Sequence, residues 1–266
     1  KGADTTVAFG STRDLKRPGT VIFVNCAYPM LEQDTQPPRP LVIGPATPNP
    51  FATAAFFNVS GMSYGAISKP AVQALSRGAA KAGVWLNTGE GGLSQAHLDG
   101  GADIVFQIGT ANYGVRDSLG QLDAVKLKAV AAHEQVRMFE IKLSQGAKPG
   151  KGGILPGAKV SGEIARIRAI PEGEDSISPN RNPAIDSGES LLDALVQVRD
   201  LTGKPVGFKA VIGDYQWLNE LCELIGLRGK ASAPDFITID SADGGTGAAP
   251  ASLIDYMGLP LKESLP

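Results

Sequence analysis

The chain has 266 residues, a formal net charge of −2 and 42% hydrophobic residues, values that are ordinary for a globular protein with one large α/β domain. The near-neutral charge gives no basic surface, so nucleic acid is not an expected partner, and no apolar run reaches the roughly 18 residues of a membrane span. Two isolated cysteines, Cys26 and Cys222, cannot form a metal site and are expected to pack as small apolar residues. Low cysteine usage predicts a cytoplasmic location.

The N-terminal part of the chain is rich in loop-forming residues. Seven prolines lie between residues 29 and 50, and they exclude long helices there because proline breaks helical hydrogen bonding. Residues 1–55 are therefore predicted to be a loop-rich lead-in that wraps the domain, with a simple linker as the alternative. Residues 56–266 are predicted to form the domain itself.

From residue 56 onward, short apolar runs alternate with amphipathic stretches. Ser68 is the expected N-cap of the first helix, and Gly83 its end. Runs that are apolar on both faces, separated by helices, indicate a parallel α/β sheet. The predicted strands are 56–59, 84–87, 104–108, 138–143, 206–211 and 236–240, and the predicted helices are 71–82, 122–134, 159–169, 189–201 and 215–227.

A doubly wound sheet and a closed barrel both satisfy this alternation. The glycine-rich and polar clusters follow strand after strand, whereas a doubly wound sheet concentrates its glycines at one switch point. This distribution favours a (β/α)8 TIM barrel with about six of its eight strands present. Because open strand edges are costly in water, more chain or another chain is expected to complete the sheet.

Two clusters at predicted strand ends could contact a ligand. The stretch 60–68 combines glycines with small hydroxyls, which lets a flat ring approach the backbone; the alternative is a βα turn with a helix cap. The stretch 87–92 places Glu90 among three glycines, where no neighbouring side chain shields the carboxylate. Such a group can meet a substrate amine or imine, and the alternative is a solvated surface loop.

Two later clusters and one lysine complete the candidate site. The stretch 142–153 interleaves three lysines with glycines, which suits an anion but does not match a P-loop; a mobile basic loop is the alternative. The stretch 240–250 could be a phosphate cradle, a ring-edge contact or a glycine-rich turn. Lys209 lies inside a predicted strand and is expected to point inward, with a solvated strand end as the alternative. His97 and His133 are not obvious ligands, and His133 is expected in a helix.

Four motifs in order give the sequence a family resemblance. Asn58–Ser68, Asn87–Gly92, Gln145–Gly150 and Asp243–Pro250 resemble the FMN-binding synthase domain of the glutamate synthase family, and especially its stand-alone FMN-binding members. The resemblance covers about residues 56–266. It implies a (β/α)8 barrel that holds FMN, and a reaction in which 2-oxoglutarate and ammonia give 2-iminoglutarate, which is reduced to L-glutamate.

The resemblance also implies roles for particular residues. Glu90 would contact the substrate amine or imine, and Gln145 and Lys148 would hold the substrate carboxylates. No metal ligands are implied. The residues that would surround the flavin are Met62, Ser63, Gln107, Lys209 at the N1–O2 edge of the ring, Gly244, Gly245 and Thr246.

The chain departs from full glutamate synthases in several places. Lys151 stands where they often carry Glu, which leaves the substrate open. A glutaminase domain, a cysteine-rich iron–sulfur segment and the last two barrel strands, which carry the flavin phosphate site in the family, are expected outside this sequence. Any iron–sulfur cluster is accordingly expected in a C-terminal part that follows this sequence. The sequence does not decide whether a membrane anchor precedes it.

The resemblance leaves partners and two alternatives to consider. The expected substrates are 2-oxoglutarate with ammonia, either free or derived from glutamine, and the expected reductant is an electron-donor protein or an NAD(P)H-oxidising subunit. One alternative is a non-catalytic fragment or scaffold subunit that binds no flavin. The other is a related synthase that condenses an alkylamine with glutamate to form an N-alkylglutamate.

Overall fold

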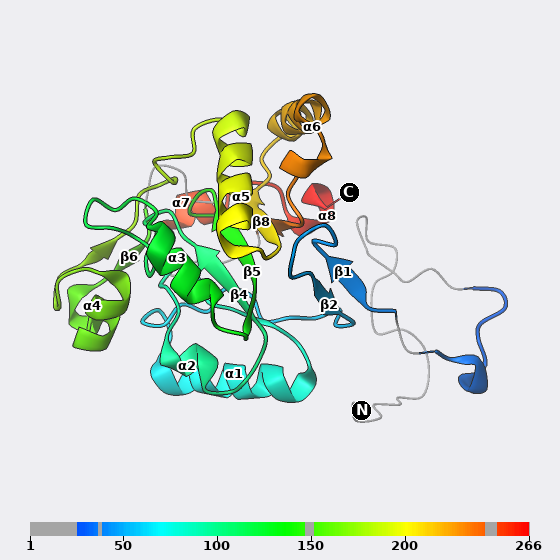
Figure 1. The fold of residues 1–266 in the computed structure, drawn as a ribbon, viewed down its shortest axis with the longest axis horizontal. Helices are drawn as coiled ribbons and strands as arrows, with labels where there is room; N and C mark the ends of the chain where they lie inside the picture. Colours follow the sequence, from blue (N-terminus) through cyan, green and yellow to red (C-terminus); the bar gives the residue numbers. More distant parts are fainter. Residues whose placement is uncertain (1–25, 37–38, 147–151, 243–248, 266) are drawn as a thin grey trace. The chain divides into compact units, whose positions relative to one another are not determined.

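The computed structural model describes residues 26–36, 39–146, 152–242 and 249–265, and the chain divides into two units, 1–38 and 39–266. The described part of the first unit holds one short 3-10 helix, Glu32–Asp34. The second unit contains the parallel sheet and its helices (Figure 1). It also contains residues 39–55, which are assigned to the lead-in from sequence, so the boundary at residue 56 stays a prediction.

The second unit is built on a five-stranded parallel sheet. Its strands are β3 (Leu86–Asn87), β4 (Ile104–Ile108), β5 (Val136–Lys142), β8 (Val206–Val211) and β9 (Ile237–Asp240). Their order in the sheet, β3-β4-β5-β8-β9, is also their order along the chain. A doubly wound sheet reverses its order at a switch point, and this sheet has no reversal. The sheet is a curled partial barrel, which confirms the predicted fold class.

The first predicted strand, 56–59, is reduced to a single backbone bridge. Val59 pairs in parallel with Leu86, outside any regular strand. Phe56 and Phe57 are 84% and 86% exposed, so this apolar run is not a buried strand. The described sheet therefore has five strands where six were expected.

Helices cover the sheet and join its strands. α1 (Lys69–Ala82) begins after the N-cap Ser68 and ends at Gly83, which has φ +67°, as the sequence predicts. The predicted helix 122–134 is shorter, because α3 ends at Ala131 and His133 lies in the following turn. The other helices are α2 (Gln95–Leu98), α4 (Gly162–Arg168), α5 (Gly188–Thr202), α6 (Gln216–Arg228), α7 (Ala251–Ile254) and α8 (Leu261–Ser264).

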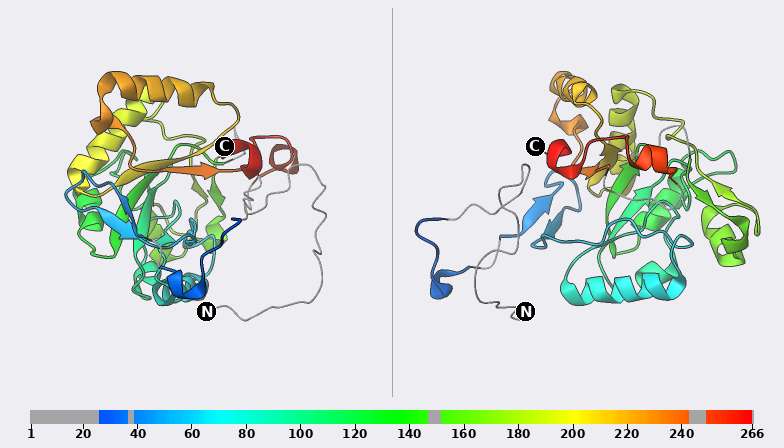
Figure 2. Two further views of the ribbon diagram at one scale, coloured as in Figure 1. Left: turned by 90° about the vertical axis from the view of Figure 1, so that its right-hand side faces the viewer. Right: turned by 180° about the vertical axis from the view of Figure 1, so that it is seen from behind.

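Short pieces complete the unit. β1 (Leu41–Ile43) and β2 (Phe51–Thr53) form an antiparallel pair, as do β6 (Ile154–Leu155) and β7 (Ser176–Ile177). Two 3-10 turns span Gly157–Lys159 and Lys230–Ser232. In Figure 2 the last helical turn, α8, lies beside the edge strand β9, with which it is in contact. No helix within the described residues is long and apolar enough to cross a membrane.

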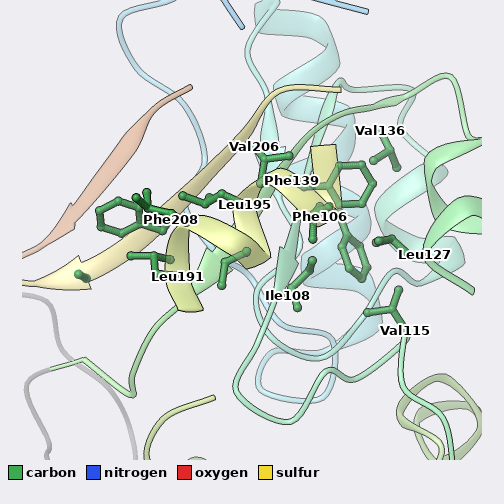
Figure 3. Packing of buried hydrophobic residues seen from close by; sticks show 14 of the residues in the cluster. Phe106, Ile108, Val115, Leu127, Val136, Phe139, Leu191, Leu195, Val206 and Phe208 are labelled. Carbon is green, nitrogen blue, oxygen red and sulfur yellow. The ribbon is translucent and has the colours of Figure 1, made fainter. Parts of the chain in front are cut away.

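The main hydrophobic core lies between one face of the sheet and helices α3, α5 and α6 (Figure 3). Alternate strand residues point to opposite faces, so every second residue of β4 and β8 enters this core. In β5 an irregularity shifts the register after Val136, so Val136, Phe139 and Ile141 enter it. The ring centroids of Phe106 and Phe139 lie 5.7 Å apart. The strand residues in the core are Ile104, Phe106, Ile108, Val136, Phe139, Ile141, Val206, Phe208 and Ala210. The residues between them are left to form the opposite face.

Both cysteines are exposed and free. The expectation that they pack as apolar residues is therefore wrong. Cys222 lies on α6, whose buried residue is Leu221, and the helical rotation of about 100° per residue turns the neighbouring position away from the core.

Lys204 fixes the end of α3 and the start of β5 to the α5–β8 loop. Its Nζ donates hydrogen bonds to the carbonyls of Ala131, at 2.5 Å, and of His133, at 3.2 Å, and also to the carbonyl of Val136. Burial lowers the pKa of Lys204, with Arg137 adding to the effect. The ammonium nevertheless satisfies the Ala131 carbonyl, which the end of α3 leaves without an intrahelical partner.

Lys204→Met should lower the free energy of unfolding by about 2 kcal/mol, because hydrogen bonds from a charged donor are lost while the apolar stem is kept. Urea unfolding followed by circular dichroism measures the change. Lys128→Met, on the exposed side of α3, is the matched control and should change stability little. Equal stability of the two variants would contradict the role of Lys204.

Candidate functional site

The face of the sheet opposite the helices lines a cavity of about 1240 Å³. Loops 58–68 and 85–90, the β1 strand and the segment around β6 enclose it further. Since alternate residues point to opposite faces of a strand, the same strands that build the core also supply this wall. The strand residues that line the cavity include Val105, Gln107, Met138, Glu140, Lys142, Lys209, Thr238 and Asp240.

A buried carboxylate occupies the middle of this inner face. Glu140 is 3% exposed. Its Oε1 accepts hydrogen bonds from Asn87 Nδ2 at 2.9 Å and from Gln107 Nε2 at 2.6 Å, and its Oε2 accepts one from Thr238 Oγ1 at 2.6 Å. One side chain on β5 thus joins β3, β4 and β9. Nothing in the sequence singles out Glu140, because its partners come from three other strands.

Glu90 sits in a second polar cluster at the carboxyl ends of the strands. Lys142 Nζ lies 3.1 Å from Glu90 Oε2, and Gln145 Nε2 donates to the same oxygen at 3.0 Å. Lys142 also donates to Gln145 Oε1 at 3.1 Å. Gln145 reaches Thr110 Oγ1 at 2.7 Å. The expectation that no side chain shields Glu90 is therefore wrong, and so is the alternative of a solvated surface carboxylate.

Two glycines leave the room that Glu90 occupies. A Cβ on Gly109 would lie 2.5 Å from Glu90 Cβ, and a Cβ on Gly153 would lie 2.5 Å from Glu90 Oε1. Any larger residue at either position would displace the carboxylate. The glycines around this loop therefore make space for packed side chains.

The surroundings of Glu90 keep it ionised. Burial by itself would raise its pKa, but the Lys142 ammonium and the hydrogen bond from Gln145 outweigh burial, so the pKa lies below its ordinary value. An ionised carboxylate accepts hydrogen bonds and attracts cations. The cluster can therefore receive an N–H group of a substrate, provided that the substrate reaches Glu90 from the cavity.

Arg168, the last residue of α4, is a buried cation of the cavity wall, and no sequence motif singles it out. It is 4% exposed and donates to Ser176 Oγ at 2.9 Å and to Ser63 Oγ at 3.3 Å. Its guanidinium lies over the ring of Tyr113. Across the described ranges no carboxylate lies within ion-pair distance of it, and its Nε has no partner. The amphipathic pattern of α4 hides this residue, because only folding brings the end of α4 under the 60–68 loop.

The 60–68 loop and the 87–92 loop pack against each other. Met62 N donates to Asn87 O at 3.0 Å. Gly89 has φ +64°, and a Cβ there would lie 2.8 Å from Ser63 N, so glycine is required for both the turn and the close approach. Met62 and Ser63 line the cavity as a result.

Lys209 lies in the interior of β8 and also lines the cavity. Its Nζ forms an ion pair with Asp240 Oδ2 at 2.6 Å, and both side chains are about a quarter exposed (24% and 21%). Gln107 shares the same face of the sheet, one strand beyond β5. Of the other predicted site residues, Lys148, Gly244, Gly245 and Thr246, like Lys151, lie outside the described residues.

Comparisons with known proteins show the family of the chain. A family model described as the conserved region in glutamate synthase matches residues 27–266. The chain belongs to the glutamate synthase family. It is 45% identical over 227 residues to the glutamate synthase large subunit-like protein YerD of Bacillus subtilis, covering 85% of this chain and 43% of that protein.

Two further relatives have lower sequence identity to this chain. The archaeal-type glutamate synthase [NADPH] of Thermotoga sp. (strain RQ2) is 37% identical over 205 residues, which is 76% of this chain and 37% of that protein. A glutamate synthase large subunit-like protein of Rhizobium meliloti is 33% identical over 205 residues, 76% of this chain and 42% of that protein. The chain thus spans roughly two fifths of the length of these relatives.

His97 supports the site from behind. It is fully buried, at 0% exposure. The backbone N–H of Ser94 donates to Nδ1 at 3.2 Å, so the ring proton sits on Nε2 and is donated to Met62 O at 2.8 Å. Burial lowers the pKa of His97 below the ordinary 6.5, although the bond to Met62 opposes this. Neutral His97 therefore holds Met62 in place.

Because the folded pKa of His97 is depressed, its contribution to stability should be complete above about pH 6.5 and be lost as the pH falls through the folded pKa. His97→Gln keeps a donor for Met62 O but cannot titrate, so the loss of stability between about pH 7 and pH 5 should become smaller. Urea unfolding at several pH values measures it. His133→Gln, at the exposed second histidine, is the control. An unchanged pH dependence in His97→Gln would contradict this role.

Proposed function

We propose that the chain is the flavin-carrying part of an oxidoreductase of the glutamate-synthase type. The proposed reaction reduces 2-iminoglutarate, formed from 2-oxoglutarate and ammonia, to L-glutamate. The observation that carries the proposal is the cluster of Glu90, Lys142 and Gln145 on the wall of the cavity, 3.0–3.1 Å from one another. The glutamate synthase names of the relatives support the same reaction class.

The cavity fits the ring of FMN in size and in chemistry. Its volume of about 1240 Å³ exceeds the roughly 300–1,000 Å³ of ordinary ligand sites, which leaves room for a cofactor and a substrate together. Met62 and Ser63 would lie against the ring, and Gln107 and Lys209 would meet its polar edge. Bound FMN would supply the hydride, and a lysine beside the N1–O2 edge favours the reduced, anionic ring.

The substrate half of the cavity suits an anion that carries nitrogen. Arg168 is a buried cation with no carboxylate partner across the described ranges, so it is proposed to pair with a substrate carboxylate. Gln145, already held by Lys142 and Thr110, and Lys148 are proposed to bind a second carboxylate. Ionised Glu90 would accept hydrogen bonds from the ammonia or imine nitrogen and so orient the carbon that is reduced.

The reductant and the nitrogen source complete the proposal. We propose that an electron-donor protein or an NAD(P)H-oxidising subunit supplies electrons, in line with the NADPH in the name of the archaeal-type glutamate synthase from Thermotoga that resembles this chain. Ammonia would come from solution or from glutamine hydrolysed elsewhere.

Purified full-length protein should show flavin absorbance bands in visible light and should release FMN on denaturation. With a reductant, it should form glutamate from 2-oxoglutarate and ammonia. Absence of flavin from the full-length protein would overturn the proposal in favour of a non-catalytic scaffold. Turnover with alkylamines and glutamate, but not with ammonia and 2-oxoglutarate, would overturn the substrate assignment.

Glu90→Gln should lower kcat by about 100-fold or more while FMN stays bound, because the charge that orients the substrate nitrogen is lost and the side-chain shape is kept. Steady-state assays and the flavin spectrum measure the two effects separately. Glu223→Gln, at an exposed carboxylate of α6, is the matched control. Full activity in Glu90→Gln would show that this carboxylate has no such role.

A further inference from the structure

Glu140 is the most buried carboxylate of the inner face, and the proposed function gives it no part. Within the described residues its three hydrogen bonds come from neutral groups, those of Asn87, Gln107 and Thr238. No lysine or arginine in the part of the chain that the structure describes lies within ion-pair distance of it. Burying a carboxylate without a cation is expensive, and apolar residues of similar volume are often as stable or more so. A role in stability alone therefore explains Glu140 poorly.

The carboxylate determines which way two amides point. The oxygens of a carboxylate can only accept hydrogen bonds. The amide of Gln107 must therefore turn its donor nitrogen, Nε2, toward Glu140. The Oε1 of Gln107 is then turned away from Glu140, and within the described residues no donor reaches it. Gln107 lines the cavity, so this oxygen is a fixed acceptor available to a ligand.

The second amide carries the effect of Glu140 to the loop of Glu90. Asn87 Nδ2 donates to Glu140, which leaves Asn87 Oδ1 to accept from Gly89 N at 2.9 Å. Gln107 N donates to Thr88 Oγ1 at 3.0 Å. The turn that presents Glu90 is thus attached to the same strands whose inner side chains Glu140 orders.

We propose that Glu140 is a positioning residue that fixes the acceptor oxygen of Gln107 toward a ring N–H of the imide type, the N3–H of a flavin. This inference rests on the proposed function, because it requires a flavin ring in the cavity. It goes further by assigning the orientation of Gln107 to Glu140, a residue to which the proposed function gives no part. The side chain of Glu140 must be long enough to bring an acceptor oxygen to Gln107 Nε2. The negative charge of Glu140 is not required for this positioning.

The test compares binding of FMN and of N3-methyl-FMN, which lacks the N–H, to the full-length protein freed of flavin. Quenching of flavin fluorescence gives both dissociation constants. Wild type should prefer FMN by about tenfold, the value of one hydrogen bond. Glu140→Asp keeps the charge but is one methylene too short, and its preference should fall below about threefold. Glu140→Gln keeps the length and an acceptor oxygen, and should retain the preference.

Glu223→Gln, at an exposed carboxylate of α6, is the matched control, and its preference should equal that of wild type. Circular dichroism and urea unfolding midpoints check that each variant folds. Glu140→Asp keeps a carboxylate, so it does not leave the donors around residue 140 facing an apolar side chain. A preference kept in Glu140→Asp, or lost in Glu140→Gln, would overturn the proposal. A wild type that binds FMN without preference would also overturn it, whereas a wild type that binds neither flavin would overturn the proposed function.

Discussion

The carboxylate of Glu140 is the contact on which the inner side of this sheet depends. Glu140 belongs to β5, the central strand, and bonds to Asn87 on β3 and to Thr238 on β9, which are the two edge strands. In a flat sheet each edge strand would lie two spacings, about 9–10 Å, from β5. One short side chain reaches both edges more easily when the sheet curls toward it. The concave wall of the cavity is the geometric result.

From this contact the arrangement of the site follows in short steps. The Asn87 side chain passes from Glu140 to the Gly89 turn, and the turn presents Glu90 to Lys142 and Gln145. On the other side of the turn, Gly89 packs against Ser63, whose hydroxyl accepts from Arg168. Residues from four separate stretches of sequence therefore depend on one another for position, which is the kind of support that a precise active site requires.

The charges on the cavity wall are paired in an uneven way. Lys142 pairs with Glu90, and Lys209 pairs with Asp240. Arg168 is buried without a carboxylate in the part of the chain that the structure describes. A buried arginine that lacks an anionic partner is best satisfied by a ligand that brings one. The local arrangement therefore suits a carboxylate substrate, although the net charge of the whole chain is −2.

The sequence by itself determined the fold class, the caps of α1, the approximate limits of α5 and α6, and the family, because apolar periodicity, helix caps and ordered glycine motifs are local signals. It also indicated Glu90, Gln145, Met62 and Lys209 as site residues. Its prediction of an unshielded Glu90 was wrong, and so was its prediction of a buried strand over residues 56–59. Only the tertiary structure revealed Glu140 and Arg168. Their partners lie on strands and loops up to about a hundred residues away, and no local pattern records contacts that chain topology creates between distant segments.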